Sequence, residues 1–406
     1  MKILTINCGS STIKFRVVDA PSPEDTGRTL AQGTIERIGP SAVCSFSAYN
    51  GAARTGGCQA ASHGLAAGEI LAWLNASGIF ADGGLTAVGH RVVHGGRRFD
   101  RPTFIDQPVL EALSEAVELS PLHNGPALEA ILTARETLGE ELPMVAVFDT
   151  TFHTTMPEWA ARYAIPGELT RKHHIRRYGF HGLAHRYMAE RCSALMQRPL
   201  ADMKLITLQL GSGCSACAIA GGKSIDTSMG LTPLEGLMMG TRSGDTDPLL
   251  AAFIARHEEV TVAEVEHWLG HRSGLLGVSG YSHDMRDVLK GEQAGNPDAT
   301  LAVQMFCYRA RKYIGAYLAA LGGVDGIVFG GVIGEHSPAI REGICATMEW
   351  CGIVLDPEAN AATVGTEGPI HSPHSRVPVY VVTVDEESVI VRDTLRCLEG
   401  RARGYE

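Results

Sequence analysis

An internal repeat limits the fold of this chain more than any other feature of its sequence. Residues 4–11 read LTINCGSS and residues 206–213 read ITLQLGSG, so about half of the 406-residue chain separates the two copies. In each copy a second apolar stretch follows the Gly-Ser turn and leads to an aspartate, Asp19 or Asp226. One explanation of the repeat is that two unrelated hairpins share turn residues, because Gly and Ser are common in turns. A duplicated domain would instead supply two glycine-rich turns whose backbone N–H groups can hold phosphate oxygens.

Strand-like and helical stretches alternate along the chain. Residues 2–19 predict a hairpin, and residues 121–124 predict the start of a polar loop. Further strands are predicted at 144–147, 205–210, 326–329 and 379–382. Helices are predicted at 69–74, 109–119, 253–269, 302–321 and 386–398. This alternation predicts an α/β fold.

Composition excludes several classes of protein. With 35 Lys and Arg against 45 Asp and Glu, the net charge of −10 disfavours nucleic acid or an anionic membrane as a partner. No apolar run reaches the roughly 18 residues of a transmembrane helix, and the first residues do not resemble a signal peptide. The ten cysteines are too sparse for a disulfide scaffold, so we expect reduced thiols and a cytoplasmic location. Cys214 and Cys217 form one CxxC pair without a partner motif, which disfavours a metal or redox role.

Three short motifs suggest chemistry that their surroundings do not support. Residues 211–216 fit GxGxxA, but a strand, a tight turn and another strand follow where a dinucleotide-binding fold needs a helix. Residues 222–224 read GKS, but Cys217 stands where a phosphate-binding P-loop needs its first glycine. His181 and His185 have metal-compatible spacing without a third ligand, so a structural or substrate-contact role is favoured.

Polar side chains gather instead in loops that glycine flanks. The sequence GHRVVHGG occupies residues 89–96, FDTTFH follows a predicted strand at 148–153, and YGFHG precedes a helix at 178–182. A loop with one arginine, GTRSGDTDP, spans 240–248, and GGVIGE follows a strand at 330–335. Strand ends are a common place for catalytic groups in α/β proteins. The joint placement of Arg, His and Asp in such loops points to a functional site.

Eight motifs follow one another in order over nearly the whole chain. The most specific is TPLEGLMMGTR at 232–242, and the others lie at 7–15, 89–96, 148–150, 179–182, 226–230, 273–277 and 284–286. Together these motifs resemble those of the acetate kinase family.

The resemblance implies both a fold and a reaction. The fold is α/β, with two duplicated actin-like (ribonuclease H-like) domains of βββαβαβα core and a cleft between them. The first domain would comprise 1–150, completed by the C-terminal helix 386–406, and the second would comprise 151–385 and carry the nucleotide. The reaction would be the reversible, Mg²⁺-dependent transfer of the ATP γ-phosphoryl group to acetate, with Mn²⁺ as a substitute ion. The resemblance also implies a homodimer, with small molecules as its other partners.

The resemblance further implies roles for individual residues. The implied catalytic groups are Asp149, His181 and the two arginines that hold the carboxylate and the transferring phosphoryl group, Arg91 and Arg242. The acetate pocket would be formed by Arg91, Val93, Leu122, Phe180 and Pro233. The nucleotide and its phosphates would be bound by Lys14, Gly211, Ser212, Gly213, Asp284, Met285, Arg286, Gly331, Val332, Ile333 and Gly334. Mg²⁺ would be held by Asn7 and Glu386, with His123 and Thr150 as supporting positions.

The chemistry of this reaction agrees with the residue types. A carboxylate acceptor is already ionised at pH 7, because carboxyl pKa values lie near about 4. No general base is therefore required. Catalysis depends on alignment and on neutralising the charge of the moving phosphoryl group, which Arg, His and Mg²⁺ supply.

Several positions depart from the family pattern. Gln209 and Ser212 replace a histidine and an asparagine of the phosphate loop, Leu183 and Ala184 replace two hydroxyl residues, and Val332 replaces a glycine. The acceptor side is intact and the donor side is altered. Propionate or another short-chain acid as the acceptor, and a donor other than ATP such as pyrophosphate, therefore stay open. A non-catalytic nucleotide sensor is disfavoured, because every implied catalytic residue is present.

Overall fold

The computed structural model describes residues 1–25, 27–81, 83–119, 121–402 and 404, without the side chains at 118, 119, 121 and 122. The chain divides into two compact units. Unit 1 comprises Met1–Thr154 and Asp385–Glu406, and unit 2 comprises Thr155–Val384. The chain therefore leaves unit 1, forms unit 2 and returns to unit 1 with its last helix.

Unit 1 is built on an eight-stranded sheet in the order β5-β4-β3-β2-β1-β6-β8-β7. Its strands are β1 (Lys2–Cys8), β2 (Thr12–Asp19), β3 (Arg28–Glu36), β4 (Val43–Ala48), β5 (Ala53–Gly57), β6 (Ala87–Val92), β7 (Thr103–Phe104) and β8 (Met144–Phe148). The expected hairpin at the N-terminus is the antiparallel pair β1–β2. β1, β6 and β8 run parallel to one another. The five residues of β8 are all buried, as parallel strands covered on both faces require.

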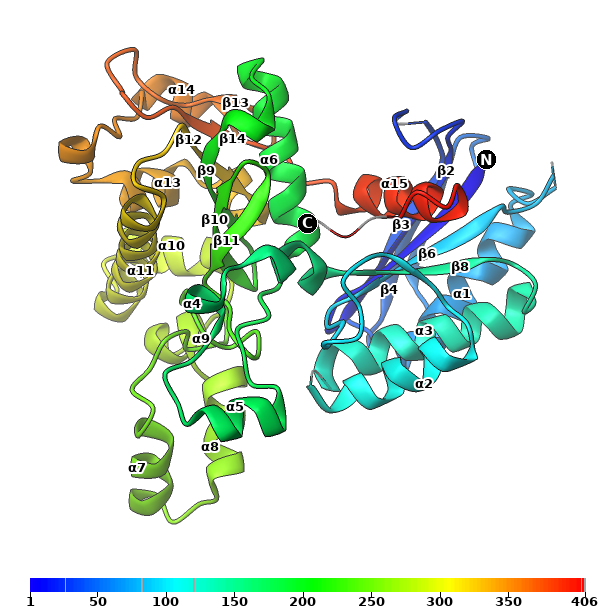
Figure 1. Ribbon diagram of the computed structural model, residues 1–406, viewed down its shortest axis with the longest axis horizontal. Helices are drawn as coiled ribbons and strands as arrows, with labels where there is room; N and C mark the ends of the chain where they lie inside the picture. Colours follow the sequence, from blue (N-terminus) through cyan, green and yellow to red (C-terminus); the bar gives the residue numbers. More distant parts are fainter. Residues whose placement is uncertain (26, 82, 120, 403, 405–406) are drawn as a thin grey trace. The chain divides into compact units, whose positions relative to one another are not determined.

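Helices cover both faces of this sheet (Figure 1). One face carries α1 (His63–Ala76), α2 (Gln107–Glu115), the 3₁₀ turn Ala116–Leu119 and α3 (Pro121–Leu138), and the other carries α15 (Glu386–Leu398). α15 approaches β6 closely at Gly89, where a Cβ would lie 2.3 Å from the hydroxyl oxygen of Thr394. A glycine at this position therefore lets the C-terminal helix lie on the sheet of the first unit.

Unit 2 repeats this topology in its own sheet, in the order β11-β10-β9-β12-β14-β13. Its strands are β9 (Lys204–Leu210), β10 (Cys214–Ala220), β11 (Lys223–Thr227), β12 (Gly326–Gly330), β13 (Gly368–Pro369) and β14 (Val379–Val381). The order β11-β10-β9-β12-β14 matches β3-β2-β1-β6-β8, with the same parallel and antiparallel pairs. One Gly-Ser turn of the repeat connects β1 to β2, and the other connects β9 to β10, so the two hairpins are equivalent. The repeat is thus a domain duplication, and the α/β prediction is confirmed.

Helices cover the second sheet as well. α6 (Gly182–Met196) lies on one face and α11 (Pro297–Leu321) on the other (Figure 1). The remaining helices are α4 (Glu158–Ala161), α5 (Gly167–His173), α7 (Leu250–His257), α8 (Val262–His271), α9 (Gly274–Ser279), α10 (Met285–Gln293), α12 (Gly331–His336), α13 (Pro338–Cys345) and α14 (Pro357–Ala362). Short 3₁₀ segments lie at Asp149–Thr155, Leu200–Asp202 and Glu349–Cys351.

Two local predictions are wrong. The single helix expected at 253–269 is two helices, α7 and α8, because Glu259 takes a positive φ of 54° and Thr261 starts a new helix with a capping box to Glu264. The loop expected at 121–124 is the first turn of α3. Proline is tolerated in a first turn, and the buried residues Ala127, Ala130, Ile131 and Ala134 hold this helix in the core of unit 1.

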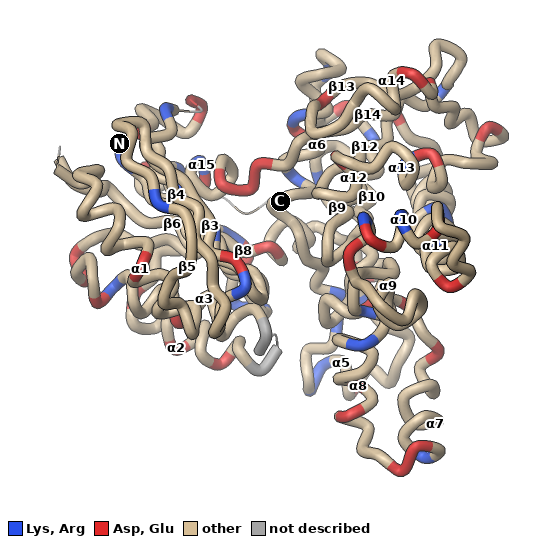
Figure 2. The backbone as a smooth tube through the Cα atoms, turned by 180° about the vertical axis from the view of Figure 1, so that it is seen from behind, with Lys and Arg blue, Asp and Glu red and all other residues tan. Residues whose placement is uncertain are grey.

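Both signs of charge are spread along each unit, without a continuous basic stripe in the described residues (Figure 2). In the same part of the chain, no helix is both long enough and apolar enough to cross a membrane.

Candidate functional site

Three predicted residues meet at one edge of the sheet in unit 1. Asn7 lies near the end of β1, Arg91 lies opposite it near the end of β6, and Asp149 follows β8 directly. The carboxyl ends of parallel strands share one edge of a sheet, which is where ligands bind in open α/β folds. The parallel pairing of β1, β6 and β8 therefore brings these side chains together.

Arg91 is the centre of a hydrogen-bonded ion network. Its guanidinium donates to both oxygens of Asp149, from Nε at 2.9 Å and from Nη2 at 2.7 Å. Nη1 donates to Asn7 Oδ1 and to Glu386 Oε2, both at 3.0 Å. Glu386 comes from the start of α15, so the C-terminal helix completes the network. The bidentate side of this planar fork is thus taken by Asp149, and four of the five N–H groups of Arg91 are engaged within the network.

The charge of Arg91 is secured by these partners. Burial alone would lower the pKa of its guanidinium, but Asp149 and Glu386 raise that pKa above its ordinary value. Asp149 is itself fully buried, so each charge depends on the other for stability. Arg91 is therefore held as a cation by its carboxylate partners.

A second layer of charged residues, which sequence reasoning missed, holds the start of α15. Arg16 donates from Nη1 to both oxygens of Asp385, at 2.9 and 2.7 Å, and lies 4.0 Å from Glu387. Asn7 Nδ2 donates to Glu386 at 2.9 Å and to Glu387 at 3.1 Å. Arg16 could have been found from the alternation of side chains along β2, which places Arg16 on the same face of the sheet as Lys14. Lys14 is exposed and lies directly opposite Asn7 in the hairpin.

The oxygen atoms of this network fit a hard divalent cation. The network holds four carboxylates, those of Asp149, Asp385, Glu386 and Glu387, against two guanidinium groups, so its formal charge is negative. The described residues contain no group of three or more His, Cys, Asp and Glu arranged to hold a metal alone. Mg²⁺ does not need such a cage, because proteins commonly bind it through one or two carboxylates together with substrate phosphates. Asn7 and Glu386 are compatible with that mode.

In unit 2, His181 lies directly beside the Gly-Ser turn at residues 211–213, the predicted phosphate loop. It precedes α6 as its N-cap residue in a left-handed conformation, with φ of 56°. A Cβ placed on Gly213 would lie 3.5 Å from Nε2 of His181 and 3.5 Å from Nη1 of Arg242. The absence of a side chain at Gly213 therefore lets His181, Arg242 and the loop backbone converge. The structure brings these three predicted residues together.

Arg242 is the last residue of the TPLEGLMMGTR segment, and its side chain contacts earlier residues of the same segment. Its Nη1 donates to the carbonyl of Pro233 at 3.1 Å and contacts the sulfur of Met239 at 3.8 Å. Burial lowers the pKa of this guanidinium below its ordinary value. The electrostatic setting thus differs from that of Arg91, whose pKa neighbouring carboxylates raise.

A partly buried network that sequence reasoning did not identify fixes the segment carrying Pro233. Arg177 donates from Nη1 to the carbonyls of Thr227, Ser228 and Met229 and pairs through Nη2 with Glu235 at 2.6 Å. Glu235 also accepts a hydrogen bond from the Tyr163 hydroxyl. The loop that positions Arg242 is therefore pinned at both ends.

In unit 2, Gly331 and Gly240 lie against the Gly-Ser turn at residues 211–213, the predicted phosphate loop. Gly331 takes φ of 74°, and a Cβ there would lie 2.6 Å from the carbonyl oxygen of Leu210, so α12 starts against the phosphate loop. The amide of Gly240 donates to the carbonyl of Ser212 at 3.0 Å. Asp284 caps α10 and pairs with the exposed Arg286. Backbone N–H groups at helix and loop starts are suited to phosphate oxygens.

The remaining predicted positions are divided between the two units. Val93 is buried in unit 1, and Phe180 is buried in unit 2. Thr150 is buried and accepts a hydrogen bond from the amide of Gly95 at 3.0 Å, so it supports the loop after β6. The side chain of Leu122 lies outside the described residues.

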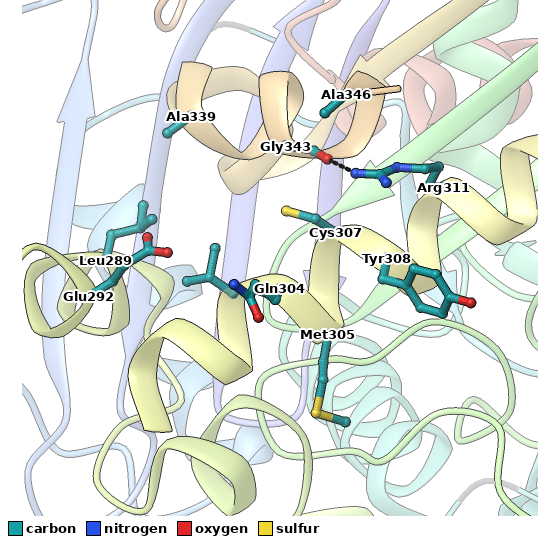
Figure 3. Close-up of a pocket in the computed structure, with 11 residues that line it drawn as sticks. Leu289, Glu292, Gln304, Met305, Cys307, Tyr308, Arg311, Ala339, Gly343 and Ala346 are labelled. Carbon is teal, nitrogen blue, oxygen red and sulfur yellow. Dashed lines mark hydrogen bonds between the residues drawn. The ribbon is translucent and has the colours of Figure 1, made fainter. Parts of the chain in front are cut away.

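A separate cavity of about 610 Å³ lies among α10, α11 and α13 (Figure 3). Its walls include Leu289, Cys307, Tyr308 and Gly343, and none of the predicted site residues lines it. Arg311 at its border donates to the carbonyl of Gly343. The cavity is thus distinct from the phosphate loop.

Comparisons with known proteins agree with this geometry. The chain matches the model of the acetokinase family over residues 2–392. It is 44% identical to acetate kinase of Chloroherpeton thalassium, over 98% of this chain and 99% of the relative. Among solved structures, it is similar to acetate kinase of Porphyromonas gingivalis (TM-score 0.88, 40% identity, 98% of this chain and 99% of that one). It is also similar to a propionate kinase of Francisella tularensis (TM-score 0.88, 37% identity, 97% and 98% covered). This chain therefore belongs to the acetokinase family.

Proposed function

We propose that this chain is a phosphotransferase that moves the γ-phosphoryl group of ATP reversibly to acetate, which gives acetyl phosphate and ADP. The observation that carries the proposal is the Arg91 network, in which carboxylates hold a guanidinium rigidly at the ends of three parallel strands. Membership of the acetokinase family supports the same reaction. The decisive experiment traps acetyl phosphate as its hydroxamate, with a panel of acids and phosphoryl donors.

The proposed catalytic residues supply the charge stabilisation that this reaction needs. Arg91 binds the carboxylate of acetate, which attacks in its ionised form. His181 and Arg242 stabilise negative charge on the phosphoryl group during transfer. Asp149 keeps Arg91 charged and oriented.

Mg²⁺, with Mn²⁺ as a substitute, is the proposed cofactor. Asn7 and Glu386 would hold the ion, because their oxygens belong to the negatively charged network at the start of α15. When bound, the ion neutralises charge on the phosphate oxygens of the nucleotide.

ATP is the proposed donor, bound through residues 211–213, 284–286 and 331–334. Gly331 approaches Leu210 closely and Gly240 donates to Ser212, which supports binding of phosphates beside residues 211–213. Pyrophosphate in the donor panel tests whether Gln209 and Ser212 change this preference.

Replacing Val332 with glycine is expected to change the KM for ATP by less than about 2-fold. The positive φ that favours glycine falls on Gly331, and Val332 is 66% exposed within α12. The valine therefore neither strains the loop nor fills its interior. ATP titrations of the parent and the variant at saturating acetate measure the difference. A marked gain in ATP affinity, with the KM for acetate unchanged, would show that Val332 obstructs the nucleotide.

Propionate is a second candidate acceptor, and the likeness to a propionate kinase favours it. Replacing the buried Val93 with alanine is expected to lower the KM for propionate more than the KM for acetate. One methylene in an apolar pocket is worth about 1–3 kcal/mol, so the enlarged space favours the longer acid. Rates with acetate, propionate and butyrate measure this shift. Equal use of butyrate and acetate by the parent enzyme would refute the pocket assignment.

We also propose that the protein is a homodimer. Leu301, Met305 and Tyr308 follow one another at helical spacing on α11 and are 48%, 43% and 59% exposed. Figure 3 shows Met305 and Tyr308 beside the cavity on this helix. An apolar stripe of this kind is suited to an interface between copies. Light scattering tests the proposal, and Met305→Glu is expected to increase the monomer fraction.

A further inference from the structure

A chain of hydrogen bonds runs from the interior of unit 2 to His181. The Thr207 hydroxyl lies 2.7 Å from Nδ1 of His185, and Nε2 of His185 lies 2.7 Å from the Ser215 hydroxyl. The same Ser215 hydroxyl lies 2.8 Å from Nδ1 of His181. Thr207, His185 and Ser215 are each fully buried. The reaction described above does not use them directly.

The fold explains why these groups meet. Thr207 on β9 is paired with Cys217 on β10, so Ser215, two residues away, points to the same face of the sheet. α6 packs on this face, and His181 and His185 lie one turn apart at its start. Leu183 and Ala184, which lie between the two histidines in the sequence, have no hydroxyl groups. The two ring nitrogens of His185 have their partners on the sheet, Thr207 on β9 and Ser215 on β10.

Counting the protons gives the chain a direction. A neutral imidazole has one N–H and one acceptor nitrogen, and a hydroxyl has one proton to donate. Within the described residues, the Thr207 hydroxyl has a single hydrogen bond, the one to His185. If His185 donated to Thr207, the buried proton of that hydroxyl would lack an acceptor, which is costly. Thr207 is therefore the donor to Nδ1 of His185.

The remaining protons follow from this first assignment. With Nδ1 as its acceptor, His185 donates from Nε2 to the oxygen of Ser215. Ser215 then donates to Nδ1 of His181, which leaves the proton of neutral His181 on Nε2. That nitrogen is on the edge of the ring that faces Gly213 in the phosphate loop.

We propose that Thr207, His185 and Ser215 are positioning residues that keep the proton of His181 on Nε2, directed at the transferring phosphoryl group. The inference rests on the proposed function, in which His181 stabilises charge on that group. A donor fixed before the reaction needs no reorganisation when negative charge develops. The chain of hydroxyls and imidazoles supplies that fixation in the interior of unit 2.

Ser215→Ala tests the central connection. It is expected to lower kcat about 10- to 100-fold, the order of effect for a misplaced catalytic group, and to leave the KM values for acetate and ATP nearly unchanged. Thr207→Val is expected to lower kcat less, and Thr207→Ser, which keeps the hydroxyl, is expected to retain the parental rate. Ser224→Ala is the matched control, because Ser224 is an equally buried serine on β11 that does not belong to the hydrogen-bonded series from Thr207 to His181.

Two further measurements separate positioning from a general structural effect. Nitrogen NMR of the imidazole rings is expected to show His181 as the Nε2–H tautomer in the parent and to show a loss of this preference in Ser215→Ala. In a His181→Ala background, Ser215→Ala is expected to cause no further loss of kcat, because residues that act as a unit are non-additive. The NMR spectra and the Thr207 pair remain informative if Ser215→Ala does not fold.

The outcomes separate the two proposals. Parental kcat in Ser215→Ala and Thr207→Val, with His181→Ala strongly impaired, would overturn the positioning role and leave the proposed function standing. An unchanged tautomer in Ser215→Ala, or an equal loss of kcat in both backgrounds, would also overturn it. Near-parental turnover by His181→Ala would instead contradict the proposed function.

Discussion

Arg91→Ala and Arg242→Ala are each expected to lower kcat by about 100-fold or more, the order of effect for loss of a preorganised charge donor. Their effects on stability are expected to differ. Arg91 neutralises the fully buried Asp149, so its removal should lower the free energy of unfolding by about 3–5 kcal/mol, as for other broken buried ion pairs. Arg242 donates to a carbonyl and a sulfur atom, and burial lowers its pKa. Its removal should therefore cost less than the removal of Arg91, about 1–3 kcal/mol, because the carbonyl and the sulfur atom that it leaves are not buried charges.

Hydroxamate rates and denaturant unfolding of the same preparations measure both effects. Arg54→Ala is the control in unit 1, because Arg54 forms a partly exposed pair with Glu69 that should contribute little. Near-normal turnover by both folded variants would show that the catalytic assignment is wrong. An Arg91→Ala protein as stable as the parent would show that Asp149 does not depend on this partner.

Glu386→Gln is expected to raise the Mg²⁺ concentration for half-maximal activity at least about 10-fold, since even residues around metal ligands change affinity by 10- to 100-fold. The substitution keeps the shape of the side chain and removes the negative charge of the carboxylate that accepts hydrogen bonds from Arg91 and Asn7. Glu387→Gln is the matched control one residue further along. Glu387 also contacts Asn7, but its carboxylate lies 4.0 Å from Arg16 and makes no described ion pair with Arg91. We expect a much smaller change in its Mg²⁺ requirement.

Mg²⁺ titrations at fixed ATP and acetate measure this difference, and unfolding curves show whether each variant is intact. Equal shifts in the two variants would mean that the general negative charge of the α15 start matters, and that Glu386 is not a specific ligand. No shift in either variant would place the cation elsewhere.

Local sequence patterns were sufficient for the outline of both units. The repeat at 4–11 and 206–213 predicted two equivalent hairpins, because a Gly-Ser turn between apolar runs is a short-range signal. The same kind of signal excluded a dinucleotide-binding helix after Gly213, where β10 is a strand. Local signals were insufficient where packing decides, as at Pro121, whose helix is held by a buried face rather than by propensity.

Tertiary structure alone decided how the functional groups are oriented. Asn7 and Glu386 are hydrogen-bonded although 379 residues separate them in the sequence, and no periodicity in either segment predicts this pairing. Motifs identified Arg91, Asp149 and His181, but not Arg16 beside α15 or Ser215 beneath His181. The sequence of a strand specifies which side chains alternate onto a face. Which strand lies beside it, and which helix covers that face, depend on burial and hydrogen bonding summed over the whole unit, and these contacts decide the direction in which a guanidinium or an imidazole points.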